Sequence, residues 1–240
     1  MVESIQNYGE YKLEFKEDEI LDDYRFANHK ILKFPDIVTH KDGNKQSLFV
    51  AQDFMLGKGG ICWDAVNILS MLNIYSELCD GKRAATALPS LLIAAYGHKV
   101  IASDLKKVIA LTQKCLELNQ NLNGSIQALE LYWGNEEHLQ IAQNLLEGQL
   151  DYIICADLIY LEETFEDLVK TLKLLSSFKD AQNPPMIFMS YKIRLPELTQ
   201  RFIDMFKVEF DIVEELNILD IHPNPQEKFI KAKLKQQKIE

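Results

Sequence analysis

LDYIICADLIY, the stretch from Leu150 to Tyr160, decides the fold of this chain. Its first seven residues are mostly apolar and include β-branched isoleucines, which is typical of a strand covered on both faces of a sheet. Asp157 closes this strand, and Tyr160 follows it. Because ligands of open α/β sheets bind at the carboxyl ends of the strands, the stretch predicts a doubly wound α/β sheet with a polar rim.

A second acidic strand end lies upstream. The segment 99–104 is a short apolar strand that ends in Asp104, and a helix is predicted to follow over 105–119. An aspartate in this place can accept hydrogen bonds from ribose hydroxyls, as in nucleotide-binding α/β folds. It can equally cap the helix that follows, because aspartate is favoured at that position. The residues alone leave both interpretations open.

The remaining segments alternate between strand and helix patterns. An Asp42-Gly43 turn between two apolar runs predicts a β-hairpin, and the chain ends in an antiparallel pair. We predict a single domain over 29–240, with the hairpin in 29–56, a Rossmann-like core in 57–240 and a polar extension over 1–28. Further helices are predicted at 64–72, 88–96, 164–175 and 196–206, and further strands at 126–133, 186–190, 210–213 and 228–234.

Composition narrows the functional classes. The chain has 240 residues, of which 47% are hydrophobic and 26% charged, as in a soluble globular protein. A net charge of -10 argues against a nucleic-acid partner. The four cysteines form no CxxC pair and the five histidines lack ligand spacing, so neither a metal site nor a disulfide framework is predicted.

The N-terminal end and the hydropathy pattern bear on location. The chain starts Met1-Val2-Glu3-Ser4, without a basic and apolar leader. No apolar stretch approaches the ~18 residues of a transmembrane helix. We therefore expect a protein of the cytoplasm, or also of the nucleus, that acts without a membrane and as a monomer.

Four side chains stand out as candidates for chemistry. A carboxylate at Asp157 beside a phenol at Tyr160 could hold an amine while excluding water, or the two could serve as a cap and a packing residue. Trp63 and Trp133 are the only tryptophans, and each can fill a core or form a wall for a flat ring. Gly134 could let the backbone come close to a ligand. The acidic residues that follow Tyr160 are those of a solvated first helical turn: Glu162, Glu163, Glu166 and Asp167.

Together these residues resemble the seven-strand S-adenosylmethionine-dependent methyltransferases, and among them methyltransferase-like family 16 of the protein lysine methyltransferases. Trp63-Asp64 and Trp133-Gly134 match two motifs of that family, and 157–160 matches its Asp-x-x-Tyr motif. The longer run 156–165 resembles the branch that methylates molecular chaperones. The resemblance covers residues 30–235.

The resemblance implies an enzyme that uses S-adenosylmethionine to methylate a lysine of a partner protein, such as a chaperone or a translation factor. It implies that Asp157 and Tyr160 orient the amine, with no metal. The residues that it assigns to the cofactor are Trp63, Ala84, Ala85, Thr86, Asp104, Trp133 and Ala156.

One motif departs from the family pattern. The family's first strand normally ends in a Glu-Leu-Gly-Ala-Gly-Thr-Gly type of loop, whereas here 81–83 runs directly into Ala84-Ala85-Thr86. We therefore expect a truncated central first strand, unless Ile74–Leu78 fills its place or the sequence is a gene-model or splice product that lacks a short segment. Two alternative functions follow: an inactive methyltransferase-like binding module, and a small-molecule N-methyltransferase. A nicotinamide-dependent dehydrogenase is disfavoured, because the chain has no GxGxxG.

Overall fold

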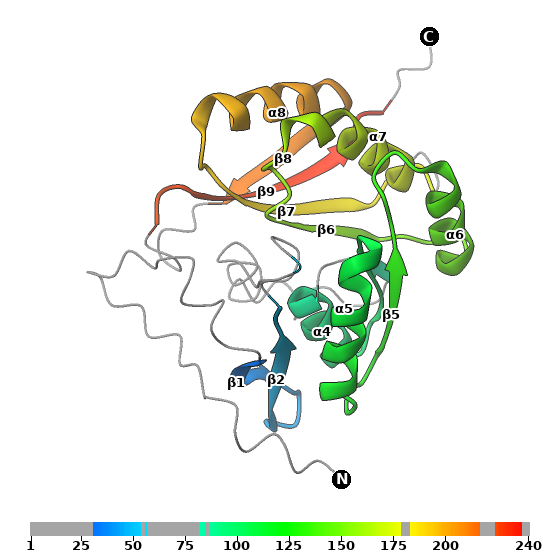
Figure 1. The fold of residues 1–240 in the computed structure, drawn as a ribbon, viewed down its shortest axis with the longest axis vertical. Helices are drawn as coiled ribbons and strands as arrows, with labels where there is room; N and C mark the ends of the chain where they lie inside the picture. The colour runs from blue at the N-terminus through cyan, green and yellow to red at the C-terminus, as the bar shows by residue number, and fades with distance from the viewer. Residues whose placement is uncertain are drawn as a thin grey trace.

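Two β-sheets organise the part of the chain that the computed structural model describes, residues 31–53, 56, 82–84, 87–178, 183–216 and 224–236 (Figure 1). One sheet is the N-terminal hairpin and the other has seven strands. The elements in chain order are β1 (Ile31–Thr39), β2 (Lys45–Ala51), β3 (Lys82–Ala84), α4 (Ala87–Ala95), β4 (Lys99–Asp104), α5 (Lys106–Leu118), β5 (Ser125–Glu130), α6 (Glu136–Leu146), β6 (Tyr152–Ala156), the 3₁₀ helix η3 (Glu162–Thr164), α7 (Phe165–Ser176), β7 (Met186–Lys192), α8 (Pro196–Glu209), β8 (Phe210–Leu216) and β9 (Glu227–Leu234).

The large sheet has the strand order β5-β4-β3-β6-β7-β9-β8. Strands β5, β4, β3, β6 and β7 are parallel to their neighbours, and β9 is antiparallel to both β7 and β8. The order runs outward from β3 to β5 and then crosses back to β6 on the other side of β3. This confirms the prediction of a doubly wound sheet with a closing antiparallel pair.

Helices cover both faces of this sheet (Figure 1). Along β6 the side chains alternate, so that Ile154 and Ala156 join one buried cluster while Ile153 and Cys155 join the other. The first cluster includes residues of α4, α5 and the β1–β2 hairpin, and the second includes residues of α6, α7 and α8. A strand buried on both faces needs apolar residues at every position, which is why β6 reads as a continuous apolar run.

The hairpin belongs to the first cluster. Helix α4 is apolar on all sides, and its residues from Leu88 to Ala95 are buried, because it lies between the large sheet and β2. The side-chain amide of Asn119 donates to the Phe49 carbonyl at 2.6 Å and accepts from the Phe49 N–H at 2.9 Å. The Ala51 N–H lies 3.2 Å from Cys115 Sγ. The hairpin is thus attached to α5 as well as to α4.

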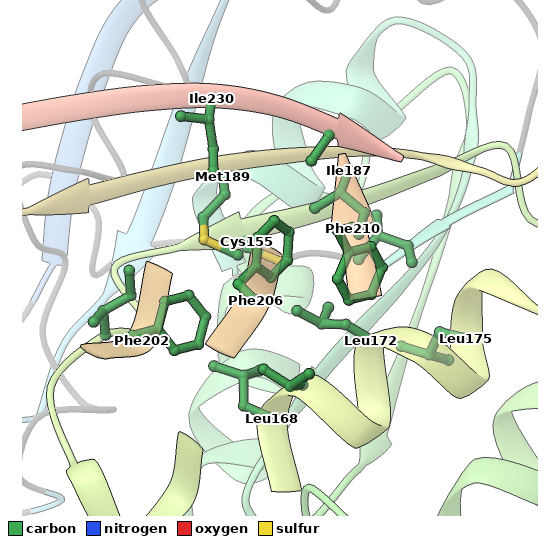
Figure 2. Close-up of a cluster of buried hydrophobic side chains, with 14 of the residues drawn as sticks. Cys155, Leu168, Leu172, Leu175, Ile187, Met189, Phe202, Phe206, Phe210 and Ile230 are labelled. Atoms are coloured by element: carbon green, nitrogen blue, oxygen red, sulfur yellow. The ribbon is translucent and has the colours of Figure 1, made fainter. Parts of the chain in front are cut away.

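The second cluster has an aromatic centre (Figure 2). Phe206 stacks on Phe202 at a centroid distance of 5.9 Å and on Phe210 at 4.4 Å. All three side chains are fully buried, and such burial stabilises a fold by about 1.5–3 kcal/mol per side chain. Cys155 lies in the same cluster, where burial raises the pKa of its thiol to about 12, so it is an unreactive core residue.

The structure corrects the segment between β5 and β6. The predicted strand over 126–133 ends at Glu130, because its pairing partner β4 ends opposite it at Asp104; the chain then turns at Gly134, whose φ is +78°. Helix α6 was not predicted at all. Its signals are an N-cap at Asn135, whose side chain accepts from the His138 N–H, and a buried stripe at Leu139, Ala142 and Leu146.

The described part of the central strand is short, in keeping with the predicted truncation. Strand β3 has three described residues and lies between β4 and β6, with Ala84 opposite both Ile101 and Ile153. The alternative that placed Ile74–Leu78 here falls on residues outside the described ranges. The predicted helix at 64–72 and the extension at 1–28 lie outside the described residues. Among the helices of the described ranges, none is both long and apolar enough to cross a membrane.

Candidate active site

The candidate residues meet at the carboxyl edge of the central strands. The strand order reverses between β3 and β6, and open α/β sheets bind ligands beside such a reversal. Asp104 is the last residue of β4, and Ala156 is the last residue of β6. Asp157 follows directly. Both aspartates are therefore placed by neighbours of β3, one on each side.

The Asp104 carboxylate is partly buried and accepts a hydrogen bond from the backbone N–H of the next residue. Its Oδ1 accepts the Leu105 N–H at 2.7 Å, and the N-cap of α5 is Leu105 rather than Asp104. Burial raises the pKa of this carboxyl to about 6, while the Leu105 hydrogen bond and the charge of Lys107 oppose the rise. Within the described part of the chain, no hydrogen bond reaches its second oxygen. That oxygen is free to accept a ligand hydroxyl.

Asp157 has an unusual backbone conformation. Its φ is +57°, in the left-handed region that non-glycine residues rarely adopt. Its N–H donates to the Ser190 carbonyl at 2.8 Å, which continues the pairing of β6 with β7 beyond Ala156. Such strained residues cluster at active sites, because the surrounding structure must hold them in place.

The Asp157 carboxylate is paired with Arg194, which sequence reasoning missed. Arg194 Nη1 donates to Oδ1 at 2.7 Å and Nη2 donates to Oδ2 at 2.6 Å. The Asp157 side chain is 4% exposed, whereas that of Arg194 is 35% exposed. A buried carboxylate needs a partner. The arginine just after the adjacent strand β7 was the feature of the sequence from which this pairing could have been predicted.

Tyr160 links the two aspartates. Desolvation raises the pKa of its half-buried phenol, and the negative charges of Asp104 and Asp157 raise it further. Asp104 ends β4 and Asp157 follows β6, the strands on either side of β3, and Tyr160 follows Asp157 by three residues, so all three candidates belong to the same edge of the sheet.

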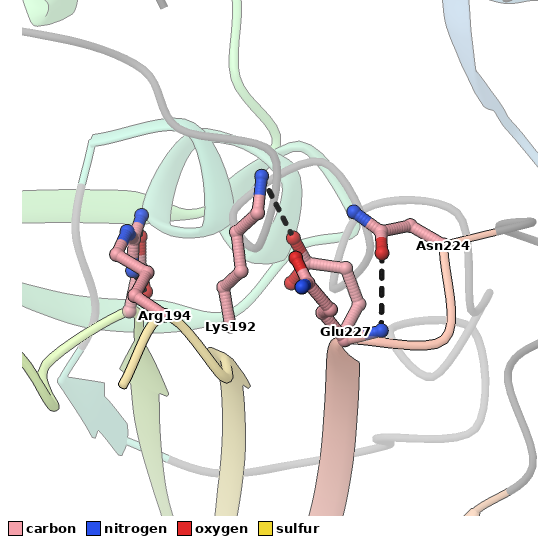
Figure 3. Close-up of polar contacts among 6 residues, drawn as sticks. Lys192, Arg194, Asn224 and Glu227 are labelled. Atoms are coloured by element: carbon pink, nitrogen blue, oxygen red, sulfur yellow. Dashed lines mark hydrogen bonds and ion pairs between the residues drawn. The ribbon is translucent and has the colours of Figure 1, made fainter. Parts of the chain in front are cut away.

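A second ion pair lies beside Arg194 (Figure 3). Lys192, at the end of β7, is opposite Glu227, at the start of β9, with Lys192 Nζ 3.8 Å from Glu227 Oε1. The Glu227 side chain is fully buried. Asn224 orders the turn before β9, because its Oδ1 accepts from the Gln226 N–H at 3.0 Å. The end of β7 thus carries two cations, each within reach of a buried carboxylate.

Trp133 and Gly134 lie farther along the same edge. Trp133 is partly buried and packs against the second cluster. Gly134 N–H donates to Thr171 Oγ1 at 2.8 Å, and a Cβ at this position would lie 2.5 Å from Asp167 Oδ1. The left-handed φ of +78° favours glycine here, and a Cβ would also displace the Asp167 side chain of α7.

The described residues fit the nucleoside half of the predicted cofactor. A carboxylate with an open oxygen at the end of β4 suits ribose hydroxyls, and the buried Ala156 adds apolar surface. Ala84 ends β3, the strand that the cofactor loop would follow. Trp63, Ala85 and Thr86 lie outside the described residues. In the described ranges no three His, Cys, Asp or Glu side chains gather as a metal site requires.

Comparison with known proteins gives one consistent result. The model of a family described as lysine methyltransferase matches residues 42–209. The protein N-lysine methyltransferase METTL21A of Mus musculus is 30% identical over 68% of this chain and 74% of its own length. The protein-lysine N-methyltransferase EFM6 of Saccharomyces cerevisiae is 36% identical over 49% of this chain and 47% of its own. An EEF1A lysine methyltransferase 3 of Xenopus tropicalis is 28% identical over 61% of this chain and 63% of its own.

Proposed function

This chain belongs to the lysine methyltransferase family, and from that membership we propose that it methylates a lysine of a chaperone or a translation factor. The methyl donor of the family is S-adenosylmethionine, and the acceptor is a protein. We further propose that Asp157 and Tyr160 orient the acceptor amine and that Asp104 binds the ribose of the donor. The observation that supports these roles is that Asp104 and Asp157 lie at the ends of the two strands that flank β3, at the edge where open α/β sheets bind ligands.

The chemistry asks the protein mainly for alignment. S-adenosylmethionine supplies a methyl group on a sulfonium, and in-line attack needs the acceptor nitrogen about 3–3.5 Å away. In our proposal the Tyr160 hydroxyl and the Asp157–Arg194 pair fix the direction of the ε-amine. Asp104 holds the ribose from the other side of β3.

The choice of acceptor rests on three supports. The run 156–165 resembles the chaperone-methylating branch, and one relative is named for its action on EEF1A. The acidic first turns of η3 and α7 would attract a basic segment around the target lysine. We expect the protein to act in the cytoplasm, where such partners are abundant.

A methyl-transfer assay tests this proposal. The protein is incubated with S-adenosylmethionine that carries a labelled methyl group, and with a lysate supplemented with a purified chaperone or with EEF1A. We expect label on one of the two, and loss of that label with Asp157→Ala. Asp211→Ala, at an exposed position of β8, is the matched control and should keep the label. Label that survives Asp157→Ala would contradict the assigned site.

A second candidate function is favoured by the three residues of β3. A shortened first strand leaves less backbone to carry a cofactor loop, so the chain could bind its partner without turnover. Calorimetric titration with S-adenosylmethionine separates the two functions. Measurable affinity supports the enzyme, whereas absence of binding together with retained partner binding supports the inactive module.

A further inference from the structure

Arg194 occupies both oxygens of the carboxylate that is proposed to orient the acceptor amine. The two hydrogen bonds, at 2.7 and 2.6 Å, have the parallel fork geometry that makes arginine–carboxylate pairs strong and directional. Each carboxylate oxygen has two lone-pair directions, so one direction on each remains for another donor. The Arg194 side chain reaches the pair from solvent, since it is 35% exposed against 4% for Asp157.

A bare carboxylate would hinder the proposed reaction. Methyl transfer needs the lone pair of an uncharged ε-amine, yet lysine is an ammonium near neutral pH. A carboxylate within about 4–6 Å favours the ammonium form, and partial burial strengthens that effect. The same group would therefore bind the lysine well and keep it unreactive.

We propose that Arg194 is a positioning residue that neutralises Asp157, so that the pair accepts a hydrogen bond from the acceptor amine without retaining its proton. This inference rests on the proposed function. The ammonium releases a proton to solvent before transfer. The amine lone pair then forms the nitrogen–carbon bond while the carbon–sulfur bond breaks and its electrons go to sulfur. The methylated ammonium finally loses a second proton to solvent.

Among the described residues, no other ion pair gives Asp157 a cation. Lys192 lies beside Arg194, but its charge faces the buried Glu227. Glu162 on η3 pairs with Arg201 on α8 at 2.7 Å. Asp104 and Tyr160 belong to the same edge, and neither is a cation.

The pH dependence of single-turnover methyl transfer tests the inference. The acceptor is whichever of the purified chaperone and EEF1A takes the label, and the rate is followed from pH 7 to pH 10, above the titration of Asp104. In Arg194→Gln the acid limb of the pH–rate profile should move to higher pH by about one unit, because the Asp157 carboxylate, without its arginine partner, stabilises the lysine ammonium. The rate near pH 7 should then fall about tenfold and recover toward wild type near pH 10.

Three controls separate positioning from mere stability. Arg194→Lys keeps the positive charge and should restore most of the wild-type midpoint. Arg201→Gln breaks a second arginine–carboxylate pair of the described residues, the one with Glu162, and should leave the midpoint unchanged. Thermal unfolding of each variant identifies loss of fold. Because a folding defect lowers the rate equally at all pH values, it would not move the midpoint.

The outcomes are distinct. An unchanged midpoint with a uniformly lower rate in Arg194→Gln would overturn the inference and leave the proposed function intact. A faster reaction and a lower KM with an unchanged midpoint would also overturn it, because Arg194 would then be a plug that substrate displaces. If the wild type labels no protein at any pH, the proposed function fails and this inference fails with it.

Discussion

The two aspartates at this edge differ in what surrounds them. Asp104 has a backbone N–H as partner, and burial raises its pKa to about 6. Asp157 is more deeply buried but is paired with both nitrogens of an arginine fork. A carboxylate without a cationic partner can accept hydrogen bonds from the hydroxyls of the donor ribose. A carboxylate that is paired with a cation suits the acceptor amine, which must be uncharged when it reacts. The same residue type thus serves two ends of one proposed reaction.

The largest expected effect comes from Asp157. In Asp157→Asn the rate of methyl transfer should fall by about 100-fold or more, because the acceptor amine loses its orientation. The dissociation constant for S-adenosylmethionine should change by less than about threefold. Single-turnover rates and calorimetric titration measure the two quantities. Equal losses of rate and cofactor affinity would contradict the assignment of the acceptor amine to Asp157 and of the cofactor ribose to Asp104.

The opposite pattern is expected at Asp104. In Asp104→Asn the affinity for S-adenosylmethionine should fall by about 10- to 100-fold, because a charge-assisted hydrogen bond to the ribose is lost. The free energy of unfolding without cofactor should rise at pH 7, by at most about 3 kcal/mol. Denaturant unfolding and titration on the same preparation test both parts. A destabilised variant would contradict the desolvation that raises the Asp104 pKa.

The pH dependence of cofactor binding sharpens the contrast further. The Asp104 pKa is raised from 3.8 to about 6, so the folded protein binds a proton there more tightly than the unfolded chain. Its contribution to stability is therefore present below about pH 4 and is lost as the pH rises through about 6. Conversely, affinity for S-adenosylmethionine should fall about tenfold from pH 7 to pH 5. Asp104→Asn should flatten this dependence, and an unchanged slope would assign it to another group.

The smallest expected effect is the coupling within the ion pair. A double-mutant cycle of Asp157→Asn and Arg194→Gln should give about 1–2 kcal/mol of interaction free energy in unfolding, since the arginine remains partly solvated. The same cycle with Asp104→Asn in place of Asp157→Asn should give a value near zero. Denaturant unfolding measures both cycles. Equal coupling in the two would mean that Arg194 acts on the whole edge.

Strand ends were the part of the site that the sequence could predict. Asp104, Asp157 and Tyr160 follow strongly patterned strands, so their shared edge follows from the parallel arrangement alone. Arg194 could not be placed in this way, because its pairing joins residues 37 positions apart and depends on how the loop after β7 folds. The functional roles of all four remain predictions.

Elements with strong patterns were also predicted well. The strand 99–104 matches β4, and the helix expected over 88–96 corresponds to α4. Helix α6 was missed because most of its residues are polar and its apolar stripe is narrow. Only the pairing of β3 with β4 and β6 reveals that three residues suffice to fill the centre of the sheet.

This short central strand divides the sheet. Within the described residues, β3 pairs with β4 at three positions and with β6 at two, whereas β4 pairs with β5 at six. The two acidic strand ends therefore stand on separate hydrogen-bonded blocks that are joined by their weakest ladder. Amide hydrogens there should exchange with solvent sooner than those of the outer strands, the reverse of the usual order in a doubly wound sheet. A nucleoside that contacted both blocks would hold them together, and its binding would slow the exchange of the backbone amides in the central ladder.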